Sequence, residues 1–84
     1  MFTQSEVLNL LQKYNNTPRQ IIKQNLKETR TKHKFKNMHI VNQLNFKKNK
    51  VNGWFNKSNP VVPTFEDALI LAETFKFDIT ELIK

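Results

Sequence analysis

The side chains best suited to molecular recognition are lysines and asparagines between residues 47 and 52, where the chain reads K-K-N-K-V-N. A lysine ammonium can pair with a phosphate group or with the hydrogen-bond acceptors of guanine. An asparagine amide donates and accepts at once, the geometry that reads adenine in the major groove. Base contacts are expected from Lys47, Lys48, Asn49 and Asn52. A phosphate contact is expected from Lys50.

Positive charge is concentrated in the middle of the chain. The formal net charge is +7 over 84 residues. Residues 18–57 hold eleven Lys or Arg and one acid, whereas residues 63–84 hold five acids and two lysines. A basic segment of this kind indicates a surface that faces a polyanion. The alternative interpretation is a solvated basic face without a partner.

Hydrophobic periodicity and capping signals predict a single all-α domain over residues 1–84. The chain has only one glycine, which argues against a β-sandwich or barrel. The expected helices span residues 3–14, 18–32, 37–44, 47–55, 65–75 and 79–83. Side-chain caps are expected at Thr3, Thr17, Thr64 and Asp78. Thr17 is followed by Pro18, a pair typical of an N-cap and a first helical residue.

Two expected helices, residues 37–44 and 47–55, are joined by a very short turn, so that the first can brace the second. Their inward positions are apolar at helical spacing: Ile40, Val41, Leu44, Val51 and Trp54. Asn45 is expected to adopt the left-handed conformation in the turn, because its short side chain tolerates it. The remaining, polar side chains of the second helix must then face outward.

Residues 22–83 resemble the lambda-repressor/Cro-like (XRE-type) helix-turn-helix family of bacterial and phage regulators, with one two-residue insertion near residues 58–62. Arg30 falls where that family has a helix-1 arginine, and Phe35 where it has a connecting leucine. The apolar positions of the two paired helices also match. The most specific match is the segment from Pro63 to Ile83, which is similar throughout to the family's closing two helices.

The resemblance implies a five-helix domain with residues 37–55 as the helix-turn-helix motif and residues 1–16 as an additional N-terminal helix. It also implies a homodimer on double-stranded DNA. Asn37, where the family commonly has glutamine, joins the expected base contacts. Further phosphate contacts are expected from Arg30, Lys36 and Lys57. Gly53, inside the recognition helix, is explained either by close approach of the backbone to DNA or by drift.

The sequence-based hypothesis is sequence-specific binding of double-stranded DNA by a small transcriptional regulator, a repressor of phage, plasmid or mobile-element type. One alternative is an interaction protein on the same scaffold, such as a phage-encoded inhibitor of a host nucleic-acid enzyme. Its partner would bind through the N-terminal helix. Another alternative is an accessory DNA-binding protein of plasmid transfer or genome packaging.

Several other function classes lack the residues they need. The absence of cysteine excludes a disulfide scaffold, a thiolate zinc site and a cysteine nucleophile. His33 and His39 have no nearby acid in the sequence, so no metal or other cofactor is expected. No nucleophile–base pair or glycine-rich phosphate loop occurs, so no enzymatic activity is expected.

No apolar run approaches the ~20 residues of a membrane span, and no secretory signal is visible. A cytoplasmic protein without membrane contact is therefore expected. The acids outside the basic segment are interpreted as caps and surface residues: Glu66, Asp67, Glu73, Asp78 and Glu81.

Overall fold

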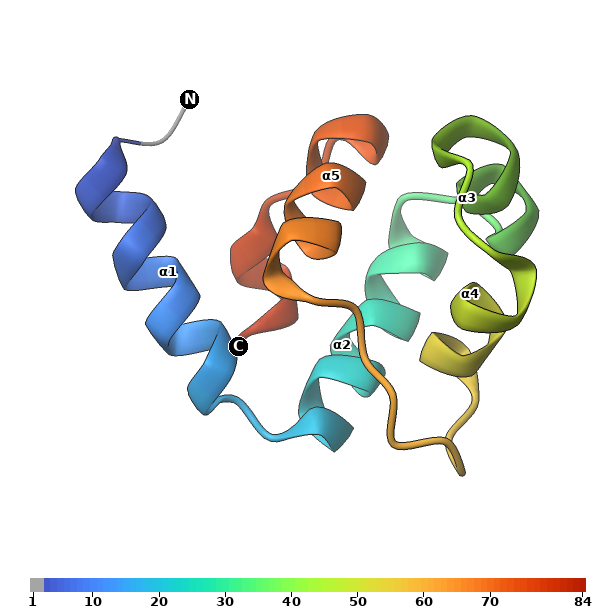
Figure 1. The fold of residues 1–84 in the computed structure, drawn as a ribbon, viewed down its shortest axis with the longest axis horizontal. Coiled ribbons are helices and arrows are strands. Elements are labelled where there is room, and N and C mark those ends of the chain that lie inside the picture. Colours follow the sequence, from blue (N-terminus) through green and yellow to red (C-terminus); the bar gives the residue numbers. More distant parts are fainter. Residues whose placement is uncertain (1–2) are drawn as a thin grey trace.

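The structure is a computed structural model that describes residues 3–84, so the first two residues of the expected N-terminal element lie outside it. The described residues form helices and no strand, as predicted. The helices are α1 (Gln4–Asn16), α2 (Arg19–Lys32), α3 (Asn37–Leu44), α4 (Lys48–Phe55), α5 (Phe65–Phe75) and the 3₁₀ helix η1 (Ile79–Leu82). Figure 1 shows α1 at one end of the molecule and α3 with α4 at the other, with α2, α5 and η1 between them.

Three of the four expected N-caps are confirmed. In each, a side-chain oxygen accepts a hydrogen bond from a backbone N–H of the first turn: Thr3 from Glu6 (3.2 Å), Thr64 from Asp67 (3.2 Å) and Asp78 from Thr80 (3.0 Å). These N–H groups have no partner inside their own helix, so the caps fix where α1, α5 and η1 begin.

The cap expected at Thr17 is wrong, because Thr17 closes α1 instead of opening α2. Its hydroxyl donates to the carbonyl oxygen of Lys13 at 2.7 Å, and α1 continues to Asn16. Pro18 then takes the N-cap position with a ψ of 141°, and α2 begins at Arg19. A threonine hydroxyl near the end of a helix commonly donates to the carbonyl four residues earlier, as Thr17 does here.

The paired helices lie close to their predicted bounds. α3 has the predicted ends, and α4 begins one residue later because Lys47, with extended backbone, is its N-cap. Asn45 adopts the predicted left-handed conformation, with a φ of 58° and a ψ of 31°. The final element is a 3₁₀ turn ending at Leu82, shorter than the predicted helix through residue 83.

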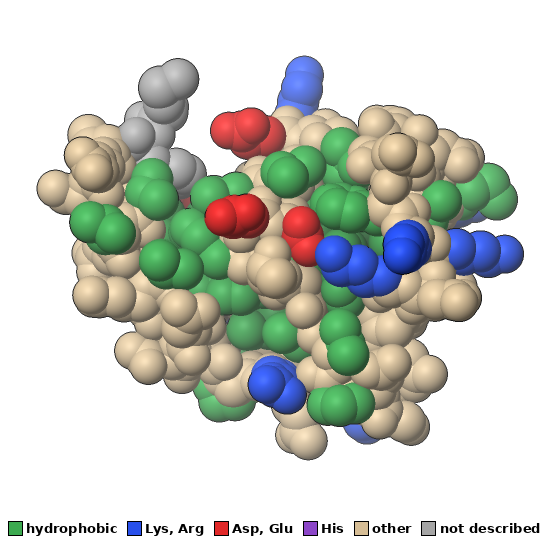
Figure 2. Space-filling model, in the orientation of Figure 1, with side chains coloured by type: hydrophobic (Ala, Val, Ile, Leu, Met, Phe, Trp, Pro, Cys, Tyr) green, Lys and Arg blue, Asp and Glu red, His purple; other side chains and the backbone are tan. Residues whose placement is uncertain are grey.

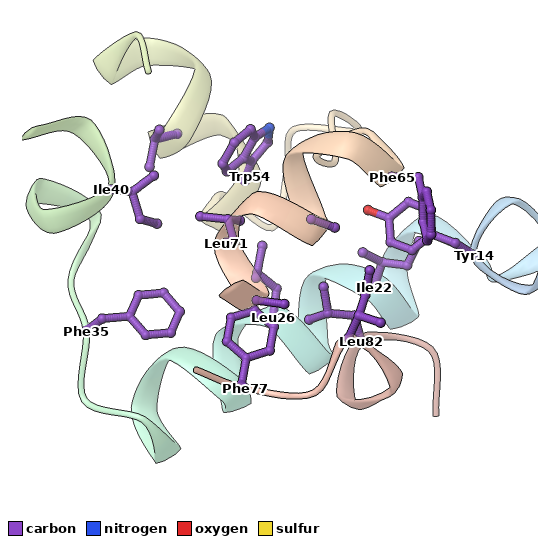
Figure 3. Close-up of a cluster of buried hydrophobic side chains, with 14 of the residues drawn as sticks. Tyr14, Ile22, Leu26, Phe35, Ile40, Trp54, Phe65, Leu71, Phe77 and Leu82 are labelled. Carbon is purple, nitrogen blue, oxygen red and sulfur yellow. The ribbon is translucent and has the colours of Figure 1, made fainter. Parts of the chain in front are cut away.

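The hydrophobic core is shared by all elements around α2 (Figure 3). One fully buried leucine comes from each of α2, α5 and η1: Leu26, Leu71 and Leu82. Phe35, in the connection between α2 and α3, is buried, and its ring stacks on that of Phe75 at a centroid distance of 4.3 Å. This common core fixes α3 and α4 relative to the rest of the chain.

α1 is attached to the domain through one face. Leu10 and Tyr14 are its buried residues. The Tyr14 ring meets that of Phe65 edge-on at a centroid distance of 5.7 Å, and its hydroxyl donates to the carbonyl oxygen of Pro63. Burial raises the pKa of Tyr14 far above its ordinary value, so this hydroxyl stays protonated as a donor.

Candidate nucleic-acid interface

α4 is anchored by one face and exposes the other. Val51 and Trp54 are fully buried, and so is Ile40 of α3, which confirms these three predicted inward positions. Val41 and Leu44 pack half-buried against the same core. Because side chains three and four residues apart share one face of a helix, Asn49 and Asn52 are left on the side opposite Val51 and Trp54.

Four of the expected base-contacting residues are exposed: Asn49 and Asn52 lie on that opposite side, and Lys47 and Lys48 lie at the N-terminal end of α4. Within residues 3–84, Asn49 makes no side-chain hydrogen bond, so both its donor and its acceptor are available. Lys47 and Lys48 form no ion pair with any described residue. The first turn of α4 therefore presents two unpaired cations and one complete amide to solvent.

A chain of side-chain hydrogen bonds joins α2, α3 and α4. Arg30 Nη1 donates to Asn37 Oδ1 at 2.9 Å, and Asn37 Nδ2 donates to Asn52 Oδ1 at 3.2 Å. The Arg30 guanidinium also lies 4.3 Å from the ring centroid of Phe55. The structure thus brings three expected contact residues together. In this chain the oxygen and the nitrogen of the Asn37 amide are both hydrogen-bonded. The amide N–H groups of Asn52 remain available to an acceptor on a partner.

Lys50, an expected phosphate contact, is exposed but is paired within the protein. Its amine lies 3.1 Å from a carboxylate oxygen of Asp67 on α5 and 5.3 Å from the ring centroid of Phe46. The phase of α4 directs Lys50 sideways, towards α5. The Lys50 side chain is 44 % exposed, and an exposed ion pair contributes about 1 kcal/mol or less, so a phosphate can compete for this lysine.

Lys36 and Lys57 lie at the two ends of the unit that α3 and α4 form. Lys36 is the N-cap residue of α3, and its backbone N–H donates to His39 Nδ1 at 3.0 Å. Lys57 follows the last residue of α4 by two positions. Both lysine side chains are exposed, so each end of the unit carries an accessible cation.

Lys23 of α2 is a positioned cation that the sequence did not reveal. Its Nζ donates to the carbonyl oxygens of Gly53 at 2.8 Å and Trp54 at 3.1 Å. Carbonyls at the C-terminal end of a helix lack internal partners and attract positive charge. Burial lowers the pKa of Lys23. The bond spans 30 residues, so no local pattern indicates it.

Gly53 is buried against the loop that follows α4, so close approach to DNA does not explain it. A β-carbon at Gly53 would lie 3.0 Å from Asn59 Nδ2. The Asn59 side chain is itself held, because its Oδ1 accepts from the N–H of Val61 at 2.9 Å. The missing side chain therefore makes room for this loop.

Glu81, expected among the surface acids, is an inter-helix partner whose side chain is only 12 % exposed. Its Oε1 accepts from Lys32 Nζ at 2.8 Å, and its Oε2 lies 3.1 Å from His33 Nε2. His33 thus has an acidic neighbour that the sequence does not place beside it. The pKa of Glu81 is held below its ordinary value, chiefly by the hydrogen bond from Lys32 and to a lesser extent by the hydrogen bond with His33.

Replacing Glu81 with glutamine should lower the free energy of unfolding by about 0.5–1 kcal/mol at neutral pH, a small loss because Lys32 is largely exposed. The folded-state pKa of Glu81 is lowered, so its contribution is present above the unfolded pKa and is lost as pH falls through the folded pKa. Urea denaturation of wild type and variant at about pH 7 and pH 3 measures this. If the free energies of unfolding of wild type and variant differed equally at both pH values, the ionic role of Glu81 would be contradicted.

Charge on the visible surface separates by element (Figure 2). Most of the visible Lys and Arg side chains lie at the end formed by α3 and α4, with others at the upper and lower edges, and acidic side chains lie over α5. The basic middle segment and acidic tail of the sequence therefore become neighbouring surfaces, with the basic one over α4.

No protein-family model, curated protein or solved structure matches this chain. None of the helices in residues 3–84 has the length and apolarity needed to cross a membrane. The described residues also contain no group of three or more histidines or acids arranged to hold a metal ion.

Proposed function

We propose that this chain binds double-stranded DNA sequence-specifically, as a small repressor-type transcriptional regulator. In this proposal α3, the turn at Asn45 and α4 act as a lambda-repressor-like helix-turn-helix unit. The observation that carries it is the two-sided character of α4. Val51 and Trp54 are fully buried on one side, the free amide of Asn49 is exposed on the other, and two unpaired lysines are exposed at the N-terminal end.

The dimensions of α4 suit the major groove. A helix with its side chains is about 10–12 Å across, and the groove is about 12 Å wide. Recognition helices of this kind contact base edges with their N-terminal residues. Lys48 and Asn49 occupy the first turn of α4, where such contacts are made.

The remaining expected contacts have separable roles in this proposal. Asn49 reads a base, because its amide is free to donate and accept together. Asn52 donates to a base acceptor and is oriented by Asn37, whose own amide is positioned by Arg30. The exposed cations at the ends of the unit neutralise phosphates.

Asn49→Ala should weaken binding to the preferred site by roughly 1–3 kcal/mol and leave binding to random duplexes nearly unchanged. Lys48→Ala should weaken binding to all duplexes and lower the salt dependence by about one charge, because an ammonium at the groove attracts any duplex whichever base it contacts. Gel shifts with a selected site and with random oligonucleotides, each at two salt concentrations, measure both effects. Equal losses for Asn49→Ala on selected and random duplexes would rule out base reading by this residue.

Part of the exposed apolar surface lies on the α1 side of the molecule, where Figure 2 shows hydrophobic side chains gathered, whereas Met38 and Val61 are exposed on α3 and in the loop after α4. A groove of about 800 Å³ between α1 and α5 is lined by Val7, Leu11 and Leu69, among others. Leu8 is 55 % and Ile70 is 42 % exposed. We propose this surface as the homodimer contact. A symmetric dimer of helix-turn-helix units reads two half-sites, typically about 34 Å apart.

The same groove favours a second candidate function, binding of a different protein on this scaffold. The gel shift separates the two functions. Retardation of DNA at low salt supports the regulator. Its absence, with the chain folded, favours the protein-binding function.

A further inference from the structure

A basic hollow lies between α2 and the loop that follows α4. It consists of two adjoining depressions of about 350 and 290 Å³ that share Gln20, Lys23 and Lys57 as lining residues. Lys27 lines the first depression and Arg19 the second. Four cationic side chains therefore surround one opening. None of the residues that line it, all within the described part of the chain, is acidic.

The single acid of α2 does not line this opening. Glu28 lies at its border, where its Oε1 accepts a hydrogen bond at 3.1 Å from Gln24 Nε2, a lining residue of the first depression, and four cations face this one acid. The amide of Gln20 adds a neutral donor to the cations. This combination of several cations with amide donors is what phosphate oxygens require.

Lys23 is the cation of the hollow whose amine is held in place by hydrogen bonds. Its Nζ is held by the carbonyl oxygens of Gly53 and Trp54, which use two of the three N–H groups of an ammonium. One donor is left over. Because the Lys23 amine is already partly desolvated and positioned, an anion beside it costs little further ordering.

The hollow is continuous with the candidate interface. Phe55 lines the first depression, and its ring lies 4.3 Å from the Arg30 guanidinium, which bonds Asn37. A duplex that places its major groove over α4 carries rows of phosphates along the groove edges. The position of the hollow, next to the C-terminal end of α4, suits one of these rows.

We propose that this hollow binds a phosphate group of the DNA backbone beside the groove that α4 enters. The inference rests on the proposed function and extends its contact surface from α3 and α4 to α2. The same chemistry would hold a phosphate of a free compound, and the experiment separates these sources.

The test is the double variant Arg19→Ala/Lys27→Ala, which removes two exposed cations and leaves Lys23 and α4 intact. The matched control, Lys13→Ala/Lys84→Ala, removes two exposed lysines that do not line the hollow. Fluorescence anisotropy with a labelled duplex, at several salt concentrations, measures binding. Thermal unfolding followed by circular dichroism checks that both variants are folded.

Relative to the control, the test variant should bind selected and random duplexes about tenfold more weakly, with a salt slope lower by about one to two. If it binds like the control while Lys48→Ala still loses affinity, the inference is overturned and the proposed function stands. Should Arg19→Ala/Lys27→Ala prove unfolded, Lys27→Gln alone should give a smaller loss of the same kind.

The second experiment is a titration of the ¹⁵N-labelled chain with pyrophosphate. Binding is detected by NMR, through shifts of the backbone amide signals of Lys23 and Gln24. Duplex binding that depends on the hollow supports the inference, whether or not pyrophosphate also shifts these signals. If wild type binds pyrophosphate through the hollow but binds no duplex at low salt, the DNA assignment is overturned and the proposed function fails with it. If the chain binds neither the duplex nor pyrophosphate, both the inference about the hollow and the proposed function are overturned.

Discussion

Trp54→Ala should lower the free energy of unfolding by about 3–5 kcal/mol, a large share of the 5–15 kcal/mol typical of a small domain. Trp54 is fully buried where α4 meets the core, and its ring packs edge-on against Phe46 at a centroid distance of 5.5 Å. Removing the indole leaves a cavity and frees α4 from the elements that orient it. DNA binding should therefore fall together with stability. Urea denaturation followed by circular dichroism measures the change.

Trp54→Phe is the matched control for this cavity. It keeps an aromatic ring in the core and removes the indole Nε1–H, which has no hydrogen-bond partner among residues 3–84. The loss of volume is then partly offset by removal of an unpaired buried donor, so the cost should be about 1 kcal/mol. If Trp54→Ala were as stable as Trp54→Phe, the indole would not be anchoring α4, and the orientation of its polar face would lose its basis.

The double charge reversal Lys47→Glu/Lys48→Glu should weaken binding to every duplex by roughly 100-fold, about 2.8 kcal/mol. These unpaired cations lie at the N-cap and first residue of α4, the end that would enter the groove. Folding should be unaffected or slightly improved, because acids at a helix N-terminus interact favourably with the helix dipole. Anisotropy titrations with selected and random duplexes measure the loss.

Lys13→Glu/Lys84→Glu makes the same change of net charge at exposed positions away from α4. It should weaken binding only modestly, through the long-range field of the whole chain. Equal losses for the two double variants would mean that net charge alone attracts the duplex. In that case the surface of α4 would have no special part in binding.

The local features of this fold were predictable because local chemistry determines them. The bounds of α3 follow from its apolar spacing, and the left-handed Asn45 follows from the short side chain that this conformation tolerates. The caps at Thr3 and Thr64 need only an oxygen near the first N–H groups of a helix. The prediction for Thr17 was wrong because α1 continues to Asn16, so that Thr17 ends α1 and Pro18 takes the N-cap position of α2, and no local signal marks where α1 ends.

The missed features of the site depend on residues that are distant in sequence. Lys50 forms an ion pair with Asp67, and the two side chains meet only because α5 folds back beside α4. Lys23 and the carbonyl oxygens of α4 meet across 30 residues. Periodicity places a side chain on a face of its own helix, but tertiary packing decides what it then meets. Sequence could therefore predict which residues of α4 face outward, but not which of them remain unpaired.

The most direct test of the α4 surface is an NMR titration of the ¹⁵N-labelled chain with a duplex selected from a random pool, at low salt. We predict that the largest shifts of amide signals fall in residues 36–57, with smaller ones along the Arg19–Lys27 side of α2 and little change in α1. Shifts confined to α1 and α5, or no shifts at all, would contradict DNA binding through α4.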